Sequence, residues 1–210
     1  MADAGLTMMD SPQEVGWRAE ALEGTGQLQA ALTQLEAGLA VFPDAGALRF
    51  ARARLQVRLN HLDEARDDFL ALLQRSGEHA DLLFALALIH LDQNRLTEAE
   101  SYLDRLEILG ERPGSVAFHR GEIAARQGAL AKALAHWAEV PPGRDYGRML
   151  RRAAYWLLAS EDEGALLGFA DAQLARYPEV RERTALALSE ALGDGEEGAV
   201  AARGVLSLAL

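Results

Sequence analysis

The amino-acid sequence contains no cysteine among its 210 residues, and this absence excludes three kinds of chemistry. Disulfide bonds, thiolate metal sites and cysteine nucleophiles all need the sulfur atom that the chain lacks. A chain without cysteine is compatible with the reducing environment of the cytoplasm.

Basic residues are in the minority, since 21 Lys and Arg stand against 32 Asp and Glu, for a formal net charge of -11. Affinity for nucleic acid comes largely from Lys and Arg that neutralise phosphates, and anionic membrane surfaces attract the same residues. We therefore expect no nucleic-acid partner and no association with an anionic membrane surface.

Long apolar runs are also missing, so the sequence predicts no membrane insertion. The N-terminal segment MADAGLTMMDSPQEVGW shows no basic stretch followed by an apolar one, the pattern typical of a secretory signal. We expect a cytoplasmic protein. A periplasmic or envelope-associated location is the alternative if a signal or an anchor has been removed from the chain.

Aromatic residues make up only 6% of the chain, whereas hydrophobic residues, mostly Ala and Leu, make up 50%. Ala and Leu are among the strongest helix formers, and few β-branched residues accompany them. This composition predicts an all-α fold without strands.

An internal repeat is marked by an alanine that returns with a period of about 34 residues, which we call the repeat period. These alanines are Ala31, Ala65, Ala99, Ala133, Ala165 and Ala199, and only the interval before Ala165 is shorter, by two positions. A second series of small residues stands twelve positions earlier and comprises Ala19, Ala53, Ala87, Gly121, Ala153 and Ala187. Small side chains at both places let two paired helices approach closely.

Turn residues and large apolar residues accompany the alanines at fixed distances. Five positions before the first four alanines stand Gly26, Asn60, Asn94 and Gly128. Glycine and asparagine tolerate the left-handed conformation of a tight turn, so we expect each to end a first helix. Four positions after the alanines, large side chains fill the space to the next unit, at Leu35, Phe69, Leu103, Trp137 and Phe169.

The motif Ala-x3-Phe, formed by Ala65 with Phe69 and by Ala165 with Phe169, resembles that of the tetratricopeptide-repeat (TPR) family. Pro43 also ends its unit as in that family. Segments 48–69, 82–103 and 118–137 are similar to consecutive repeats of bacterial multi-TPR proteins. The resemblance covers about residues 12–203 and implies a right-handed α-solenoid of about six helix-turn-helix units.

The resemblance also implies an organisation of the whole chain. We expect a flexible N-terminal tail over residues 1–11 and a TPR array over residues 12–210. Its repeats are expected at about residues 12–44, 45–78, 79–112, 113–144, 145–178 and 179–210. The first and last repeats depart most from the family pattern, as is usual for terminal units of a solenoid.

In TPR proteins the first helices line a concave groove, so the resemblance implies that their inward residues bind a partner. An apolar centre with a charged rim suits an extended peptide or an amphipathic helix. The expected groove residues are Phe50, Arg54, Val57, Arg58, Phe84, Leu88, Leu91, Phe118, Glu122 and Arg126. The alternative is that the three phenylalanines, which are one repeat period apart, belong to the core between repeats.

Catalytic and metal-ligating residues are not expected, and neither is a cofactor. His119 and Glu122 are three positions apart on one helix, but no third ligand has a suitable spacing. We therefore predict that both are solvated or cap a helix. His90 replaces an aromatic residue of the family pattern and is predicted to pack between helices.

The C-terminal segment AVAARGVLSLAL is unusually apolar for a last solenoid helix. We expect it to fold back on the preceding helix pair, or else to bury its apolar face against a second copy of the chain, a partner, or residues absent from this sequence. The leading hypothesis is thus a non-catalytic scaffold or adaptor for a protein or peptide partner. The alternative is a structural module of a homo-oligomer or of a bacterial envelope-associated assembly, and an enzyme is a third, weaker hypothesis because no titratable residues converge.

Overall fold

The computed structural model describes residues 11–160, 163–193 and 196–209. These residues form twelve α-helices and one short 3-10 helix, and no strand occurs among them. The predicted all-α fold is therefore confirmed. The predicted tail falls almost entirely on residues 1–10, which lie outside the described part.

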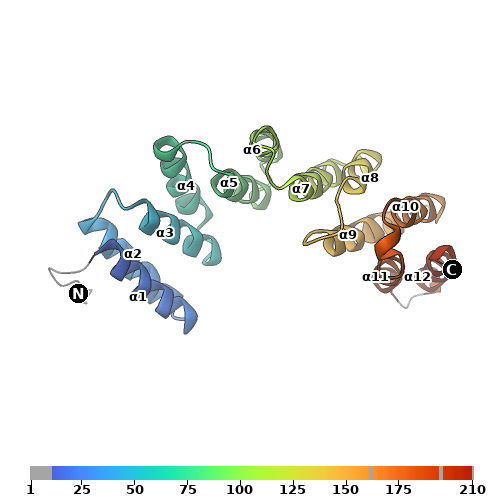
Figure 1. Ribbon diagram of the computed structural model, residues 1–210, viewed down its shortest axis with the longest axis horizontal. Helices are drawn as coiled ribbons and strands as arrows, with labels where there is room; N and C mark the ends of the chain where they lie inside the picture. The colour runs from blue at the N-terminus through green and yellow to red at the C-terminus, as the bar shows by residue number, and fades with distance from the viewer. Residues whose placement is uncertain (1–10, 161–162, 194–195, 210) are drawn as a thin grey trace. The chain divides into compact units, whose positions relative to one another are not determined.

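The chain divides into two compact units, Met1–Arg105 and Leu106–Leu210. Helix α6, Leu96–Ile108, crosses the boundary between them (Figure 1). The other helices of the first unit are α1 (Pro12–Gly24), α2 (Leu28–Val41), α3 (Gly46–Arg58), α4 (Leu62–Ser76) and α5 (Ala80–Asp92). The second unit contains α7 (Pro113–Arg126), α8 (Leu130–Ala138), α9 (Tyr146–Ala159), α10 (Glu163–Arg176), the 3-10 helix Pro178–Val180, α11 (Arg181–Leu192) and α12 (Glu196–Ala209).

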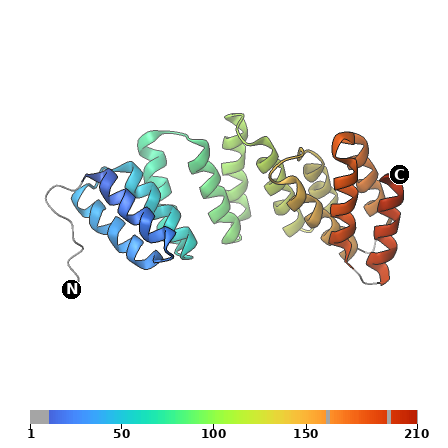
Figure 2. The same cartoon turned by 60° about the horizontal axis from the view of Figure 1, so that its bottom comes forward.

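Consecutive helices form antiparallel hairpins within each unit, as α1 with α2 and α11 with α12 illustrate (Figure 2). Four of the turns inside hairpins contain the residues that the sequence marked. Gly26, Asn60, Asn94 and Gly128 have φ values of 77°, 61°, 56° and 75°. The predicted left-handed turns are therefore confirmed, and they explain why these positions hold only glycine or asparagine.

The packing predicted from the alanine series is confirmed in the first four repeats. Ala31, Ala65, Ala99 and Ala133 are all fully buried. The large residues four positions later, from Leu35 to Trp137, are buried as well. Close packing of a small residue beside a large one therefore recurs in each of these hairpins.

In the last two repeats the series is confirmed only in part: Phe169 is buried as predicted, whereas Ala165 and Ala199 are only partly buried. Leu166 and Ala170 fill the interior position of α10 instead. Successive side chains of an α-helix point in directions about 100° apart around the helix axis. Ala165, which precedes the buried Leu166, therefore lies at the edge of the buried face. The shortened interval before Ala165 coincides with this change of register.

A buried carboxylate joins α3 to α4 in the first unit. Asp68 accepts hydrogen bonds from Nε and Nη2 of Arg52, both at 2.7 Å, and from Nη1 of Arg49 at 3.3 Å. The hydrogen bonds that Arg52 donates to Asp68 raise the pKa of its guanidinium above the ordinary value. Two arginines on one helix thus hold a carboxylate that would otherwise be costly to bury.

We expect Asp68→Ala to lower the free energy of unfolding of the first unit by about 2–3 kcal/mol, because the charge-assisted hydrogen bonds from Arg52 and Arg49 are lost. Asp67→Ala is the matched control, since Asp67 is exposed and its pair with Arg66 at 2.9 Å is worth less than about 1 kcal/mol. Urea unfolding followed by circular dichroism measures both. Equal losses would show that the Asp68 cluster contributes no more than a surface ion pair.

The core of the second unit is centred on Trp137, which is fully buried. Its Nε1–H donates to the backbone carbonyl of Phe118 at 3.1 Å. Gly121 lies against the indole, and a Cβ on this glycine would come within 2.2 Å of Nε1. The small residue that the sequence places at position 121 is therefore required by the neighbouring tryptophan.

The prediction that His119 and Glu122 are solvated or cap a helix is wrong. His119 is 6% exposed and Glu122 is 9% exposed, because both side chains of α7 are covered within the second unit. Burial, with a smaller contribution from the positive charge of Arg148, lowers the pKa of His119 to about 4. Burial raises the pKa of Glu122 above its usual range.

Acid is therefore expected to destabilise the second unit through His119. Above the ordinary histidine pKa of 6.5 the residue is neutral in both the folded and the unfolded states, so it has no effect. Between pH 6.5 and about 4 only the unfolded state takes up the proton, and the loss reaches about 2 kcal/mol by about pH 5. Glu122 acts in the opposite direction, since its raised pKa favours the folded state as the pH falls.

Unfolding free energies of wild type and His119→Gln at about pH 7.5 and pH 5 isolate this contribution, because Glu122 and the other groups remain in both proteins. Wild type is expected to lose more stability than the variant. The same loss in both proteins would contradict the assignment to His119.

Helix α12 folds back on α10 and α11, as its apolar sequence predicts. Val205 and Ala201 of this helix are buried, whereas Val200 and Leu206 are exposed. Helices of sufficient length and hydrophobicity to cross a bilayer are not found in the described part of the chain.

Candidate functional site

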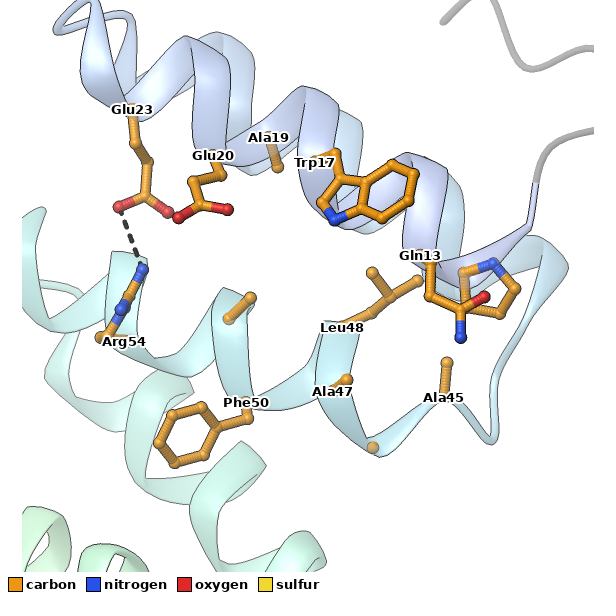
Figure 3. A pocket seen from close by; sticks show the side chains of 14 residues that line it. Gln13, Trp17, Ala19, Glu20, Glu23, Ala45, Ala47, Leu48, Phe50 and Arg54 are labelled. Carbon is orange, nitrogen blue, oxygen red and sulfur yellow. Dashed lines mark ion pairs between the residues drawn. The ribbon is translucent and has the colours of Figure 1, made fainter.

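A groove of about 510 Å³ lies between α1 and α3, the first helices of the first two repeats (Figure 3). Its lining residues come from these two helices and from the turn before α3. They are Pro12, Gln13, Gly16, Trp17, Ala19, Glu20, Glu23, Ala45, Gly46, Ala47, Leu48, Phe50, Ala51 and Arg54.

The floor and one wall of the groove are apolar. Leu48 and Ala19 are buried at its base. Phe50 is half-buried and packs edge-on against Phe69, with 5.7 Å between the two ring centroids. Trp17 extends from α1 with 67% of its surface exposed. An indole this accessible beside an apolar hollow is a surface that a partner side chain can cover.

Gly16 accounts for the hollow itself. It stands one repeat period before Phe50, and Phe84 and Phe118 continue that series, so the first repeat lacks the phenylalanine that the next three repeats carry. A Cβ at Gly16 would make only an ordinary contact, 3.7 Å from Cδ2 of Leu48. The space is thus left open because a large side chain is absent from one repeat.

Charged side chains close one end of the groove (Figure 3). Glu23 pairs with Arg58 at 2.7 Å and with Arg54 at 3.5 Å, which ties α1 to α3. Glu20, one helical turn closer to Trp17, is exposed and makes no ion pair within the described residues. The groove therefore combines an apolar base with a rim that carries both signs of charge.

The N-terminus of α1 is fixed by a capping box. The Ser11 hydroxyl accepts a hydrogen bond from the Glu14 backbone N–H at 3.3 Å, and the Glu14 carboxylate accepts one from the Ser11 N–H at 2.7 Å. Pro12 occupies the first helical turn, where its missing N–H is not needed. These contacts hold the helix that forms one wall of the groove.

Of the residues predicted for the groove, Phe50 and Arg54 line it, and Arg58 supports it through Glu23. Val57 lies on the same helix and is partly exposed. Phe84 and Leu88 are half-buried on α5, whereas Leu91 is buried and therefore offers no surface to a partner.

The other three predicted residues belong to the second unit. Phe118 is 1% exposed and packs in the core, which was the alternative for this phenylalanine. Glu122 is buried, with one oxygen 3.3 Å from Nε of Arg152, and Arg126 is exposed. Burial makes Phe118 a structural residue rather than a surface for recognition.

Sequence reasoning missed Trp17 and Gly16, which define the hollow. The expected groove is marked by phenylalanines separated by the repeat period, and Gly16 interrupts that series. The available signal was the interruption itself, because a glycine in the place of a repeated aromatic residue leaves space and the adjacent tryptophan is free to border it.

Metal ligands do not gather among the described residues, where no group of three or more His, Asp or Glu side chains has a suitable arrangement. Repeated helical hairpins whose first helices border a groove define the class of helical-repeat proteins, or α-solenoids. Within this class, the family model described as tetratricopeptide repeat matches residues 18–73 and 50–116. Residues 18–116 are therefore tetratricopeptide repeats, and the fold of the chain is that of a TPR solenoid.

Solved structures share this fold. YrrB, described as a TPR protein with an unusual peptide-binding site, is 24% identical and matches over 76% of this chain and 83% of its own, with a TM-score of 0.56. The TPR protein TTC0263 of Thermus thermophilus is 22% identical over 85% of this chain and 99% of its own, with a TM-score of 0.57.

MamA of Desulfovibrio magneticus RS-1 is 17% identical over 62% of this chain and 73% of the compared MamA chain, with a TM-score of 0.57. At these levels of identity the structures share the fold with this chain, and the likeness extends no further. Among curated proteins, none matches the sequence.

Proposed function

We propose that this TPR protein is a non-catalytic scaffold that binds a peptide or an amphipathic helix of a protein partner in the groove between α1 and α3. The observation that carries the proposal is the exposed indole of Trp17 beside the hollow at Gly16. The match to a family of interaction modules supports the scaffold role.

The energetics of the groove favour one or two inserted side chains. Burial of a large apolar side chain contributes about 1.5–3 kcal/mol, and tryptophans at the centre of an interface often dominate its affinity. A volume of about 510 Å³ is within the usual range of binding pockets, about 300–1,000 Å³. The charges of Glu20 and Arg54 then orient the bound segment. YrrB, which shares the fold, is itself described as binding peptide.

Filling the hollow tests the proposal. Peptides selected from a displayed library on wild type are measured by fluorescence anisotropy against Gly16→Leu and Trp17→Ala, and we expect each variant to weaken binding by at least about tenfold, or about 1.4 kcal/mol. Ala21→Leu is the matched control, because it adds a leucine to an exposed position of α1 outside the groove. Peptides that bind Gly16→Leu as tightly as wild type would place the binding surface elsewhere.

Gly16→Ala, a smaller change, is expected to stabilise the first unit by about 0.5–1 kcal/mol, because alanine is the better helix former and its Cβ meets no close contact. Gly38→Ala should have the opposite effect, since its Cβ would come within 2.5 Å of Cγ1 of Val15. Thermal melting of both variants checks the pair. Destabilisation by Gly16→Ala would mean that the space beside Leu48 is not open.

Homo-oligomerisation is the second candidate function, and a specific surface favours it. Leu186 of α11 and Val200 and Leu206 of α12 are exposed apolar residues on the last hairpin. A structural module would bury them against a second copy. Sedimentation of wild type and Leu206→Glu over a range of concentrations tests this alternative. If it is correct, wild type forms an oligomer and the Leu206→Glu variant is a monomer.

A further inference from the structure

Three arginines and a tyrosine form the exposed face of α9 in a protein whose net charge is -11. Arg148, Arg151, Arg152 and Tyr155 are all exposed, and their spacing of three and four positions places them on one side of the helix. The opposite side carries Met149, Leu150 and other core residues. We call these four residues the arginine face.

Two of the three arginines already contact carboxylates at the edge of this face. Arg152 pairs with Glu122 of α7 at 3.3 Å, and Arg148 pairs with Asp145 at 3.2 Å. The guanidinium of Arg148 also lies over the ring of Phe118, 4.7 Å from its centroid. These contacts hold the two arginines in place, which lowers the entropy cost of binding an anion.

Positive charge exceeds negative charge at this location. Arg151 makes no hydrogen bond or ion pair with the part of the chain that is described, and the neighbouring Arg144 makes none either. Glu122 is 9% exposed, and its Oε1 has no hydrogen-bond partner among the described residues. The positive charges of Arg148 and Arg126 also contribute to the lowered pKa of His119, so their field reaches the interior of the unit.

We propose that the arginine face of α9 binds an acidic protein segment, whose Asp or Glu carboxylates pair with Arg151 and Arg152 and whose apolar side chains pack on Tyr155. Guanidinium and carboxylate groups form strong, charge-assisted hydrogen bonds in a fixed geometry. A short acidic segment can stay within this face, whereas a long polyanion such as RNA would meet the acidic remainder of the protein. The proposal concerns the second unit and is independent of the groove in the first unit.

Charge reversal on the full chain tests the proposal. The probe is a fluorescein-labelled poly-glutamate peptide in about 0.1 M salt, where charges more than about 10 Å apart are largely screened. We expect wild type to bind it and Arg151→Glu to weaken binding at least about tenfold, because an attractive contact becomes repulsive. Arg183→Glu is the matched control, since Arg183 is an exposed arginine of α11 without a partner among the described residues, and it should change affinity less than about twofold.

The outcomes separate the alternatives. Loss of binding in Arg151→Glu alone, with unchanged melting of both variants, supports the arginine face. Equal weakening by both variants would mean that only net charge matters, and failure of wild type to bind the peptide would overturn the proposal directly. Tighter binding of a poly-uridine oligonucleotide than of the peptide, lost in Arg151→Glu, would also overturn it by assigning the face to nucleic acid.

Discussion

Ala65→Glu is expected to unfold the first unit of the protein. Ala65 is 0% exposed on α4, and Phe69, one turn further along, is buried beside it. A glutamate side chain at this position would either separate α3 from α4 or leave a carboxylate without water or a partner. The cost of such a buried charge, several kcal/mol, is a large fraction of the roughly 5–15 kcal/mol that stabilises a typical domain.

Circular dichroism of the variant should show a loss of helical signal at a temperature where wild type is folded. Ala30→Glu is the matched control, because Ala30 is exposed on α2 of the same unit and the same substitution there should leave melting nearly unchanged. A wild-type melting curve for Ala65→Glu would show that the assigned helix register is wrong.

Gly121→Ala is expected to have the second largest effect, in the second unit, although it adds a single methyl group. The new Cβ would lie 2.2 Å from Nε1 and 2.3 Å from Cδ1 of Trp137, so the indole must move. Movement would break its hydrogen bond to the Phe118 carbonyl and disturb the packing that the ring provides. We expect a loss of about 3 kcal/mol, the upper part of the range for overpacking.

The comparison with Gly168→Ala separates this clash from helix propensity. Gly168 lies in α10 of the same unit, and a Cβ there would meet no atom within 4 Å, so alanine should stabilise by up to about 1 kcal/mol. In a Trp137→Leu background the cost of Gly121→Ala should shrink, because the smaller side chain can move away. Similar effects of both glycine substitutions in the wild-type background would contradict a tight contact with the indole.

Much of the fold could be predicted from the sequence because TPR packing is local and periodic. The burial of Ala65 and Phe69 and the left-handed turn at Asn60 depend on contacts within a single hairpin. The spacing of these residues in the sequence is therefore enough to predict both features. The prediction was less accurate at Ala165, where the interval between the alanines is shorter. In α10 the fully buried small residue is Ala170, and Ala165 is only partly buried. Periodicity places a residue on a helix but does not say how far that helix is rotated toward the core.

The candidate site was less accessible to sequence reasoning, because exposure depends on neighbours from other helices. Phe50 and Phe118 occupy equivalent places in their repeats, yet Phe50 borders a groove and Phe118 is buried beneath Arg148. The sequence likewise predicts that His119 and Glu122 are solvated or cap a helix, because no residue that covers them is visible in it. Their burial follows from the second unit as a whole, including α9.

The glycine at position 16 has a consequence for how a partner would be aligned. Successive TPR repeats present similar surfaces once in every repeat period, so a ligand that recognised only the common features could shift by one repeat at little cost. The hollow lies beside Gly16, whereas the equivalent positions of the next two repeats hold Phe50 and Phe84. This difference makes the first repeat distinguishable from the others. A partner that inserts a side chain there can bind in one register only, so a single missing side chain would specify where along the first unit recognition begins.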